Sequence, residues 1–407
     1  MDKVRLGIIG LGQRGYQIAE TIANCVPEID IVAVSDVLPE RVEKACALIK
    51  EKRGTVADGY SDYHDLISSD KVQAVFVATG WESHVSVSIE AIQAKKATAM
   101  EVGGAYNLEE LWELVDVVEN SNVPFMFMEN CCFGEYELMV TNMARQGVLG
   151  EISHCSGAYS HDLREEVSKG KENHHYRLKN YIERNCENYP THELGPIAKL
   201  IGINRGNRML SLYSVSSKQR GIHEYVRQNP ETVDQNLLNV EFKQGDIVNT
   251  VIKCENGETI ALKLDTTLPR FYSREFSVHG TKGMYSELAH TVFLDGNENH
   301  WDSRSLLNNE KDFLDKYSTK MWKSLTQEER DSGHGGMDLF ELKSFARHLI
   351  ENKPMPIDVY DAAAWMCITC LSDKSIRENT SVEIPDFTRG KYKERELKDV
   401  LEWSEEL

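Results

Sequence analysis

The sequence contains no apolar run long enough to cross a bilayer. Its first residues, MDKVR, lead directly into a strand-like segment, with no hydrophobic region of a signal peptide before it. Its nine cysteines do not form paired CxxC motifs at the spacing of a zinc site. The His174-His175 pair has no carboxylate or cysteine partner at a recognisable spacing, so we predict no metal site. Free thiols in a reducing compartment are expected, and with them a soluble, cytoplasmic protein.

The sequence also has fewer basic than acidic residues. The chain has 46 lysines and arginines against 65 aspartates and glutamates, which gives a formal net charge of −19. This balance argues against nucleic acid or an anionic membrane as a general partner, although a few local arginines can still hold a small anionic molecule. With 407 residues, the chain is long enough for two domains with sizeable cores.

The most informative segment is LGIIGLGQRG, in which a short apolar strand leads into Gly10-x-Gly12-x-x-Gly15 and then into a helix-like segment. Such a turn brings the backbone close to a pyrophosphate, and the helix N-terminus, with Gln13 and Arg14, faces the phosphates. A second strand-like segment ends in Asp36, at about the spacing expected for an acid that binds the adenosine ribose. We therefore predict an NAD(H) site rather than an NADP(H) site. A glycine-rich turn without a ligand is the alternative.

Apolar strands alternate with amphipathic helices over residues 1–130, which predicts a doubly covered parallel sheet and an α/β fold. Ligands of such sheets lie beyond the carboxyl ends of the strands. This places further cofactor contacts in the segments that follow the strands. They are Trp81, His84, Glu101, Val102 and Asn130.

The pattern changes after residue 130. Apolar and polar residues alternate between about 237 and 290, with NG and QGD turns, which predicts a large, mainly antiparallel sheet in a second α+β domain over 131–407. Some alternating apolar residues exceed what one core needs, so we expect a homodimer or homotetramer that pairs through this sheet. These residues are Val240, Phe242, Val251, Ile260 and Leu262.

The layout resembles the Gfo/Idh/MocA oxidoreductases, in which a Rossmann domain precedes a sheet domain that carries the substrate site. Most members have a Glu-Lys-Pro segment whose lysine transfers a proton, whereas this chain has Glu101-Val102-Gly103. A narrower resemblance, to glycoside hydrolase family 109, rests on motifs spread in order along the chain. They are GAYSHDLR (157–164), Tyr176-Arg177, NYPTH (188–192) with LGP and INRG, Tyr272-Ser273-Arg274, GTKG (280–283) and GHGGMD (333–338).

The resemblance implies removal of terminal α-linked N-acetylgalactosamine with tightly held NAD⁺. The sugar is transiently oxidised at C3, the C2 proton is lost with expulsion of the C1 leaving group, water adds, and the cofactor returns the hydride. His192 is the candidate acceptor of the C3 hydroxyl proton, and Tyr159 is the candidate C2 base if Arg177 or NAD⁺ lowers its pKa. The implied sugar-binding residues are Arg177, Tyr189, Thr191 and Tyr272, and Tyr189 also borders the cofactor.

Other interpretations stay open at this point. Spacing alone does not distinguish His192 from a core histidine, and tyrosines in strand-like segments are often structural. A plain NAD-dependent sugar oxidoreductase is the main alternative function, and a non-enzymatic dinucleotide-binding regulator is another. Two departures from the family, Gly103 for the usual proline and Glu193 for the usual glycine, leave the sugar specificity undecided.

Overall fold

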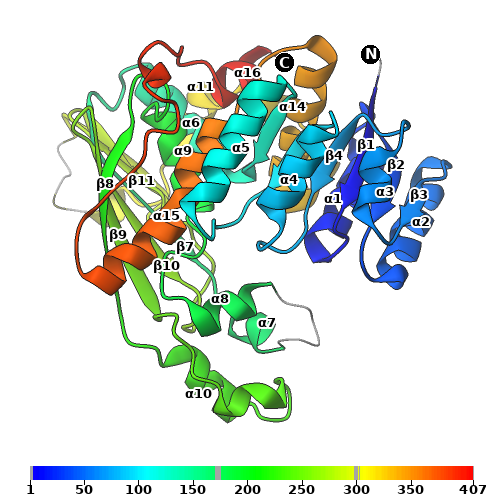
Figure 1. The fold of residues 1–407 in the computed structure, drawn as a ribbon. Helices are drawn as coiled ribbons and strands as arrows, with labels where there is room; N and C mark the ends of the chain where they lie inside the picture. Colours follow the sequence, from blue (N-terminus) through cyan, green and yellow to red (C-terminus); the bar gives the residue numbers. More distant parts are fainter. Residues whose placement is uncertain (1–2, 170–175, 298–300, 302, 407) are drawn as a thin grey trace.

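The computed structural model describes residues 3–169, 176–297, 301 and 303–406, so the His174-His175 pair lies outside the described residues. Its first layer is a six-stranded parallel sheet in the order β3-β2-β1-β4-β5-β6 (Figure 1). The strands are β1 (Val4–Ile9), β2 (Ile29–Ser35), β3 (Asp58–Tyr60), β4 (Ala74–Val77), β5 (Ala97–Glu101) and β6 (Phe125–Met128). The predicted Rossmann-type α/β architecture is confirmed.

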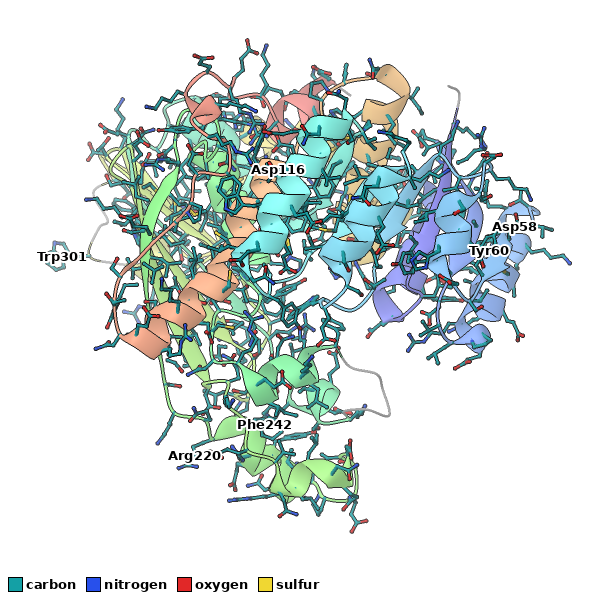
Figure 2. The ribbon with its side chains drawn as sticks, viewed as in Figure 1. Asp58, Tyr60, Asp116, Arg220, Phe242 and Trp301 are labelled. Atoms are coloured by element: carbon teal, nitrogen blue, oxygen red, sulfur yellow. The ribbon has the colours of Figure 1, made fainter. Side chains whose placement is uncertain are left out.

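Helices connect these strands and cover the sheet, because each crossover between parallel strands has to pass over one of its faces. They are α1 (Gln13–Cys25), α2 (Pro39–Arg53), α3 (Tyr63–Ser68), α4 (His84–Gln93) and α5 (Leu108–Ser121). The short strand β3, which the sequence pattern did not reveal, forms the outer edge of the sheet, where Figure 2 labels Asp58 and Tyr60.

The second layer is an eight-stranded mixed sheet in the order β13-β12-β11-β7-β10-β9-β8-β14. Only the β7–β10 pair is parallel, so the predicted mainly antiparallel character is confirmed. The strands are β7 (Ile152–Ser160), β8 (Met209–Ser216), β9 (Ile247–Cys254), β10 (Thr259–Asp265), β11 (Ser277–Gly280), β12 (Gly283–Ser286), β13 (Thr291–Leu294) and β14 (Val382–Glu383).

The helices of the second half tie the two sheets together. Helix α14 (Met337–Glu351) packs on α1, and α15 (Val359–Glu378) contacts α5, β6 and β8 (Figure 1). The others are η1 (Asn130–Phe133), α6 (Glu135–Arg145), α7 (Arg164–Ser168), α8 (Arg177–Glu183), α9 (Thr191–Leu200), α10 (Gly221–Gln228), η3 (Gln235–Asn239), η4 (Ser303–Ser305), α11 (Lys311–Tyr317), α12 (Lys320–Ser324), α13 (Gln327–Arg330), η5 (Gly333–Gly336), η6 (Lys391–Lys393) and α16 (Val400–Glu406). No helix among the described residues is long and apolar enough to cross a membrane.

The expected outward apolar stripe on the large sheet was largely wrong. Phe242, Ile260 and Leu262 are buried inside the chain, and Val240 is partly buried. Residues 240–246 form no strand, and Phe242 contacts His223 of α10 in an arm that projects from the sheet (Figures 1 and 2). Of the five residues, only Val251 is exposed, because a single step in strand register exchanges the inner and outer faces.

Candidate active site

A cavity of about 1020 Å³ opens beyond the carboxyl ends of the parallel strands and extends to β7 and α9 of the second layer. The structure brings most of the predicted site residues to its walls. These are Gly10, Gly12, Gln13, Arg14, Asp36, Trp81, His84, Glu101, Val102, Asn130, Tyr159, Arg177, Tyr189 and His192. Gly15, Thr191 and Tyr272 do not line the cavity.

The glycine-rich turn fits a pyrophosphate group. Gly10 has a φ of +89°, and a Cβ on it would lie 2.5 Å from the carbonyl oxygen of Ala78. A Cβ on Gly15 would lie 1.9 Å from the carbonyl oxygen of Gly10, so Gly15 is required for the packing of α1 against the turn. Gly12 begins α1 without a side-chain cap, which leaves the first amide groups of this helix facing the cavity.

Asp36 follows β2 and is held by the backbone around it. Its carboxylate accepts hydrogen bonds from the amides of Leu11 (2.7 Å) and Leu38 (2.9 Å), and Nη1 of Arg41 lies 3.5 Å away. The carboxylate is therefore fixed at the edge of the cavity, as the ribose of an adenosine requires. Arg41 was not singled out in the sequence, and it is a cation within reach of the same position.

Arg14 links the glycine-rich turn to the far end of the chain. It pairs with Glu101 of β5, and its Nη2 donates a hydrogen bond of 3.1 Å to Asp338 of α14. Asn130 donates to the same carboxylate at 2.7 Å, and His334 lies 2.9 Å from it. Burial alone would raise the pKa of Asp338, but Arg14 and His334 together hold it well below its usual range.

Trp81 and His84 have different positions in the loop after β4. His84 is buried, and its Nε2 lies 2.7 Å from the carbonyl oxygen of Thr79; burial lowers its pKa, so it holds the loop as a neutral side chain. Trp81 stacks on Tyr189 at 5.4 Å, with the Arg177 guanidinium 5.2 Å from the indole. A Cβ on Gly103 would lie 2.8 Å from this indole, so the departure at 103 makes room for Trp81.

His192, in the first turn of α9, is oriented by Glu129 at the end of β6. Its Nδ1 lies 2.8 Å from Oε1 of Glu129, and the Tyr189 hydroxyl lies 3.3 Å from its Nε2. Burial opposes the charge on Glu129, yet its pKa is lowered because His192 lies so close. A carboxylate in this position favours the tautomer with hydrogen on Nδ1 and leaves Nε2 as the proton acceptor.

The same corner contains a set of side chains of metal-ligand type, Glu129, Cys131 and His192, whose ligand atoms lie within 4.8 Å of one another. The Sγ of Cys131 donates a hydrogen bond to Oδ1 of Asn130 at 3.5 Å, as a neutral thiol does, and burial raises the pKa of this thiol well above its usual range. The short contact between Glu129 and His192 is accounted for by their hydrogen bond. The geometry therefore describes a histidine–carboxylate pair.

Tyr159, near the end of β7, lines the cavity beside His192, and the two rings make an edge-to-face contact with their centroids 5.7 Å apart. Burial raises the pKa of its phenol, and the Arg177 guanidinium, whose Nη2 lies 3.5 Å from the hydroxyl, offsets this only in part. Arg177 therefore counteracts the effect of burial on the pKa of Tyr159 without cancelling it, and a lowering by Arg177 together with NAD⁺ stays a prediction. The hydroxyl has another neighbour, Nδ1 of His161 at 3.1 Å, which sequence reasoning passed over.

The remaining predicted residues lie around this centre. Tyr272 is half exposed at the rim, with its ring 5.2 Å from His161. Thr191 is fully buried at the start of α9, beside Glu129. Glu193 is buried and is not among the residues that line the cavity. The substitution at 193 therefore leaves the lining of the cavity unchanged.

Comparison with known proteins agrees with this geometry. Residues 4–128 match the model described as "Oxidoreductase family, NAD-binding Rossmann fold", and residues 133–394 match "Glycosyl hydrolase 109, C-terminal domain". The chain belongs to glycosyl hydrolase family 109. It is an enzyme of the NAD-dependent type, with its dinucleotide site in the parallel-sheet layer.

Relatives of this family 109 enzyme match along nearly its whole length. A glycosyl hydrolase family 109 protein of Stenotrophomonas maltophilia is 35% identical over 97% of the chain and 91% of the relative. The Tannerella forsythia protein named alpha-N-acetylgalactosaminidase is 33% identical over 97% of the chain and 88% of the relative.

Solved structures share the fold at low identity. A levoglucosan dehydrogenase in complex with NADH and levoglucosan superposes with a TM-score of 0.71 at 18% identity, over 94% of this chain and 100% of that chain. An apo scyllo-inositol dehydrogenase from Lactobacillus casei has a TM-score of 0.66 at 14% identity, over 94% of this chain and 98% of that one. These matches support the architecture alone.

Proposed function

We propose that this enzyme removes terminal α-linked N-acetylgalactosamine, or a closely related N-acetylhexosamine, by oxidation at C3, elimination across C1–C2 and addition of water. The observation that carries the proposal is the His192–Glu129 pair, which lies edge-on beside Tyr159 on the wall of a cavity that continues into the dinucleotide site. The name of the Tannerella forsythia relative supports the choice of sugar.

The residues present fit NAD⁺ as the cofactor. The uncapped start of α1 would face the pyrophosphate, and Asp36 would hold the adenosine ribose. When bound, NAD⁺ supplies a reversible acceptor for the hydrogen of a sugar carbon. The lysine that serves proton transfer in most of the wider superfamily is replaced here by Val102, so that proton has to go to another side chain. His192 is available for it.

The side chains divide the proton transfers between them. His192 accepts the C3 hydroxyl proton at Nε2, and the Glu129 carboxylate stabilises the resulting imidazolium. Tyr159 accepts the C2 proton, which a C3 ketone makes acidic. Arg177 and Tyr189 present hydrogen-bond donors to the sugar hydroxyls and the N-acetyl oxygen, with Thr191 and Tyr272 supporting them from behind and from the rim.

The test is cleavage of a panel of p-nitrophenyl glycosides by the purified enzyme in D₂O. Redox-neutral release of p-nitrophenol, best with the α-N-acetylgalactosaminide, and deuterium at C2 of the released sugar are the expected results. Stoichiometric NADH with no released aglycone indicates the alternative, a sugar dehydrogenase. Cleavage without C2 exchange and without a need for NAD⁺ rules out the elimination route.

We further propose a division into a Rossmann domain over 1–130 and a substrate domain over 131–407, in a cytoplasmic homodimer or homotetramer. All nine cysteines lie among the described residues and none forms a disulfide. The outward face of the large sheet still presents Tyr213, Val215 and Val251, of which Tyr213 and Val251 are paired neighbours. A monomer in sedimentation at micromolar concentration refutes the oligomer.

A further inference from the structure

The unsolved step in the proposed reaction is how Tyr159 becomes a base. Its phenol is buried, burial raises its pKa, and Arg177 offsets only part of that rise. A neutral phenol cannot accept the C2 proton unless its own proton leaves at the same time. The acceptor of the phenol proton therefore has to lie within hydrogen-bond distance of the Tyr159 hydroxyl.

Nδ1 of His161 lies 3.1 Å from this hydroxyl, closer than Nη2 of Arg177 at 3.5 Å. His161 follows Tyr159 by two residues, so both side chains lie on the same side of the extended chain at the end of β7. The backbone amide of His161 donates to the carbonyl oxygen of Asp265 at 2.9 Å, which fixes its place. Its ring stands edge-on to Tyr159 at 5.8 Å and to Tyr272 at 5.2 Å, and it lines the cavity.

The surroundings keep the His161 imidazole neutral and therefore able to accept a proton. Burial lowers its pKa first, and the positive charge of Arg177 and the nearby His192 lower it further. Glu166 and Asp162 act in the opposite direction and do not reverse the shift. With hydrogen on Nε2, the lone pair of Nδ1 faces the phenol of Tyr159.

We propose that His161 accepts the phenol proton of Tyr159 while Tyr159 removes the C2 proton of the oxidised sugar. The C2–H electron pair forms the C1=C2 double bond, and the C1–O bond breaks with its pair on the aglycone oxygen, which takes a proton from solvent. When water adds at C1, it releases its second proton to solvent, while Tyr159 returns a proton to C2 and recovers its own from His161. This proposal rests on the proposed function and adds a second catalytic histidine to it.

The test compares His161→Asn with the wild type. Asparagine places a carbonyl oxygen near the position of Nδ1 and keeps a hydrogen bond to the phenol, but it cannot be protonated near neutral pH. We expect C2 deuterium incorporation and aglycone release to fall by about 100-fold or more, the typical contribution of general base catalysis. Oxidation at C3 depends on His192 and continues, so absorbance at 340 nm from reduced cofactor accumulates on the enzyme.

Two comparisons make the result specific. His290→Asn alters an exposed histidine that pairs with Glu310 outside the cavity, and it should exchange C2 at the wild-type rate. Adding His161→Asn to Tyr159→Phe should cause no further loss, because the base that His161 serves is already absent. The residual rate of His161→Asn should rise with pH where the wild-type rate is flat, since solvent hydroxide then has to take the phenol proton.

The outcomes separate this proposal from the proposed function. Wild-type exchange at C2 together with exchange within threefold of it in His161→Asn refutes the role of His161 and leaves the proposed function standing. Absence of C2 exchange in the wild type refutes both. If His161→Asn does not bind the cofactor with wild-type affinity, His161→Gln takes its place and the same two criteria apply.

Discussion

Replacing Glu129 with glutamine tests the histidine–carboxylate pair most directly. Glutamine keeps the size of the side chain and one hydrogen bond to Nδ1 of His192, but removes the buried negative charge that lies 2.8 Å from the ring. That charge stabilises the imidazolium form that appears when His192 takes the C3 hydroxyl proton. The loss should therefore fall on the oxidation step and spare the later C2 exchange.

The size of the effect follows from the geometry. A hydrogen bond to a charged partner contributes about 1.5–3 kcal/mol. If this is present in the transition state only, each ~1.4 kcal/mol corresponds to a tenfold change in rate, so Glu129→Gln should slow oxidation by about 10- to 160-fold. Any population of the wrong tautomer adds to this loss.

The assay is the single-turnover rise of absorbance at 340 nm with saturating sugar, followed over a range of pH. Because the pKa of Glu129 is lowered, its carboxylate stays ionised through the neutral range, and its own titration should not appear in the wild-type profile. Glu193→Gln is the matched control, since burial and Glu187 raise the pKa of Glu193 and its side chain does not line the cavity. Oxidation by Glu129→Gln within threefold of wild type refutes the assigned role.

Three further predictions follow from the same structure. Asp36→Ala should weaken NAD(H) and strengthen NADP(H), because Arg41 then faces the ribose without its carboxylate neighbour; equal wild-type affinity for both cofactors, measured by fluorescence, contradicts the role of Asp36. Gly103→Ala should displace the Trp81 indole, which lies 2.8 Å from the added Cβ, and should raise KM and lower the free energy of unfolding by about 1–3 kcal/mol. Gly80→Ala is the control: the nearest atom to its added Cβ is the Cβ of Tyr176 at 3.6 Å, so its thermal unfolding should match that of the wild type. Glu187→Gln should have a higher melting temperature than the wild type at pH 8 but not at pH 4.5. Burial raises the pKa of Glu187 to about 8, so the free energy of unfolding of the wild type falls by up to about 1.4 kcal/mol per pH unit between these two pH values. A difference in melting temperature that does not change with pH contradicts this prediction.

Local patterns were sufficient for much of the fold and for the cofactor site. Buried parallel strands have continuous apolar sequences, and the turn after β1 needs glycine at positions 10 and 15 for steric reasons that a sequence displays directly. Because ligands of parallel sheets bind beyond the carboxyl ends of the strands, the sequence also predicted that Asp36, Trp81 and Asn130 line one cavity. These predictions depend on contacts that are close in sequence or fixed by sheet geometry.

The parts that were missed depend on contacts distant in sequence or on strand register. Asp338 meets Arg14 across 324 positions, and GHGGMD was used only as a motif of the family resemblance, with no partner predicted for Asp338. Phe242 was assigned to an outer sheet face because alternation does not reveal which face is buried or where a strand begins. His161 was passed over because only the structure shows which neighbour the Tyr159 hydroxyl has.

The ion pair between Arg14 and Asp338 has a consequence for the folding of this protein during its synthesis. The two residues are 324 positions apart in the sequence, and the parallel-sheet layer leaves the ribosome well before α14 does. Until α14 packs on α1, Arg14 and Asn130 lack their shared carboxylate. We expect the dinucleotide site to be complete only after α14 has been synthesised and has packed on α1, so that the ligand adds its binding free energy to a chain that has already assembled both layers.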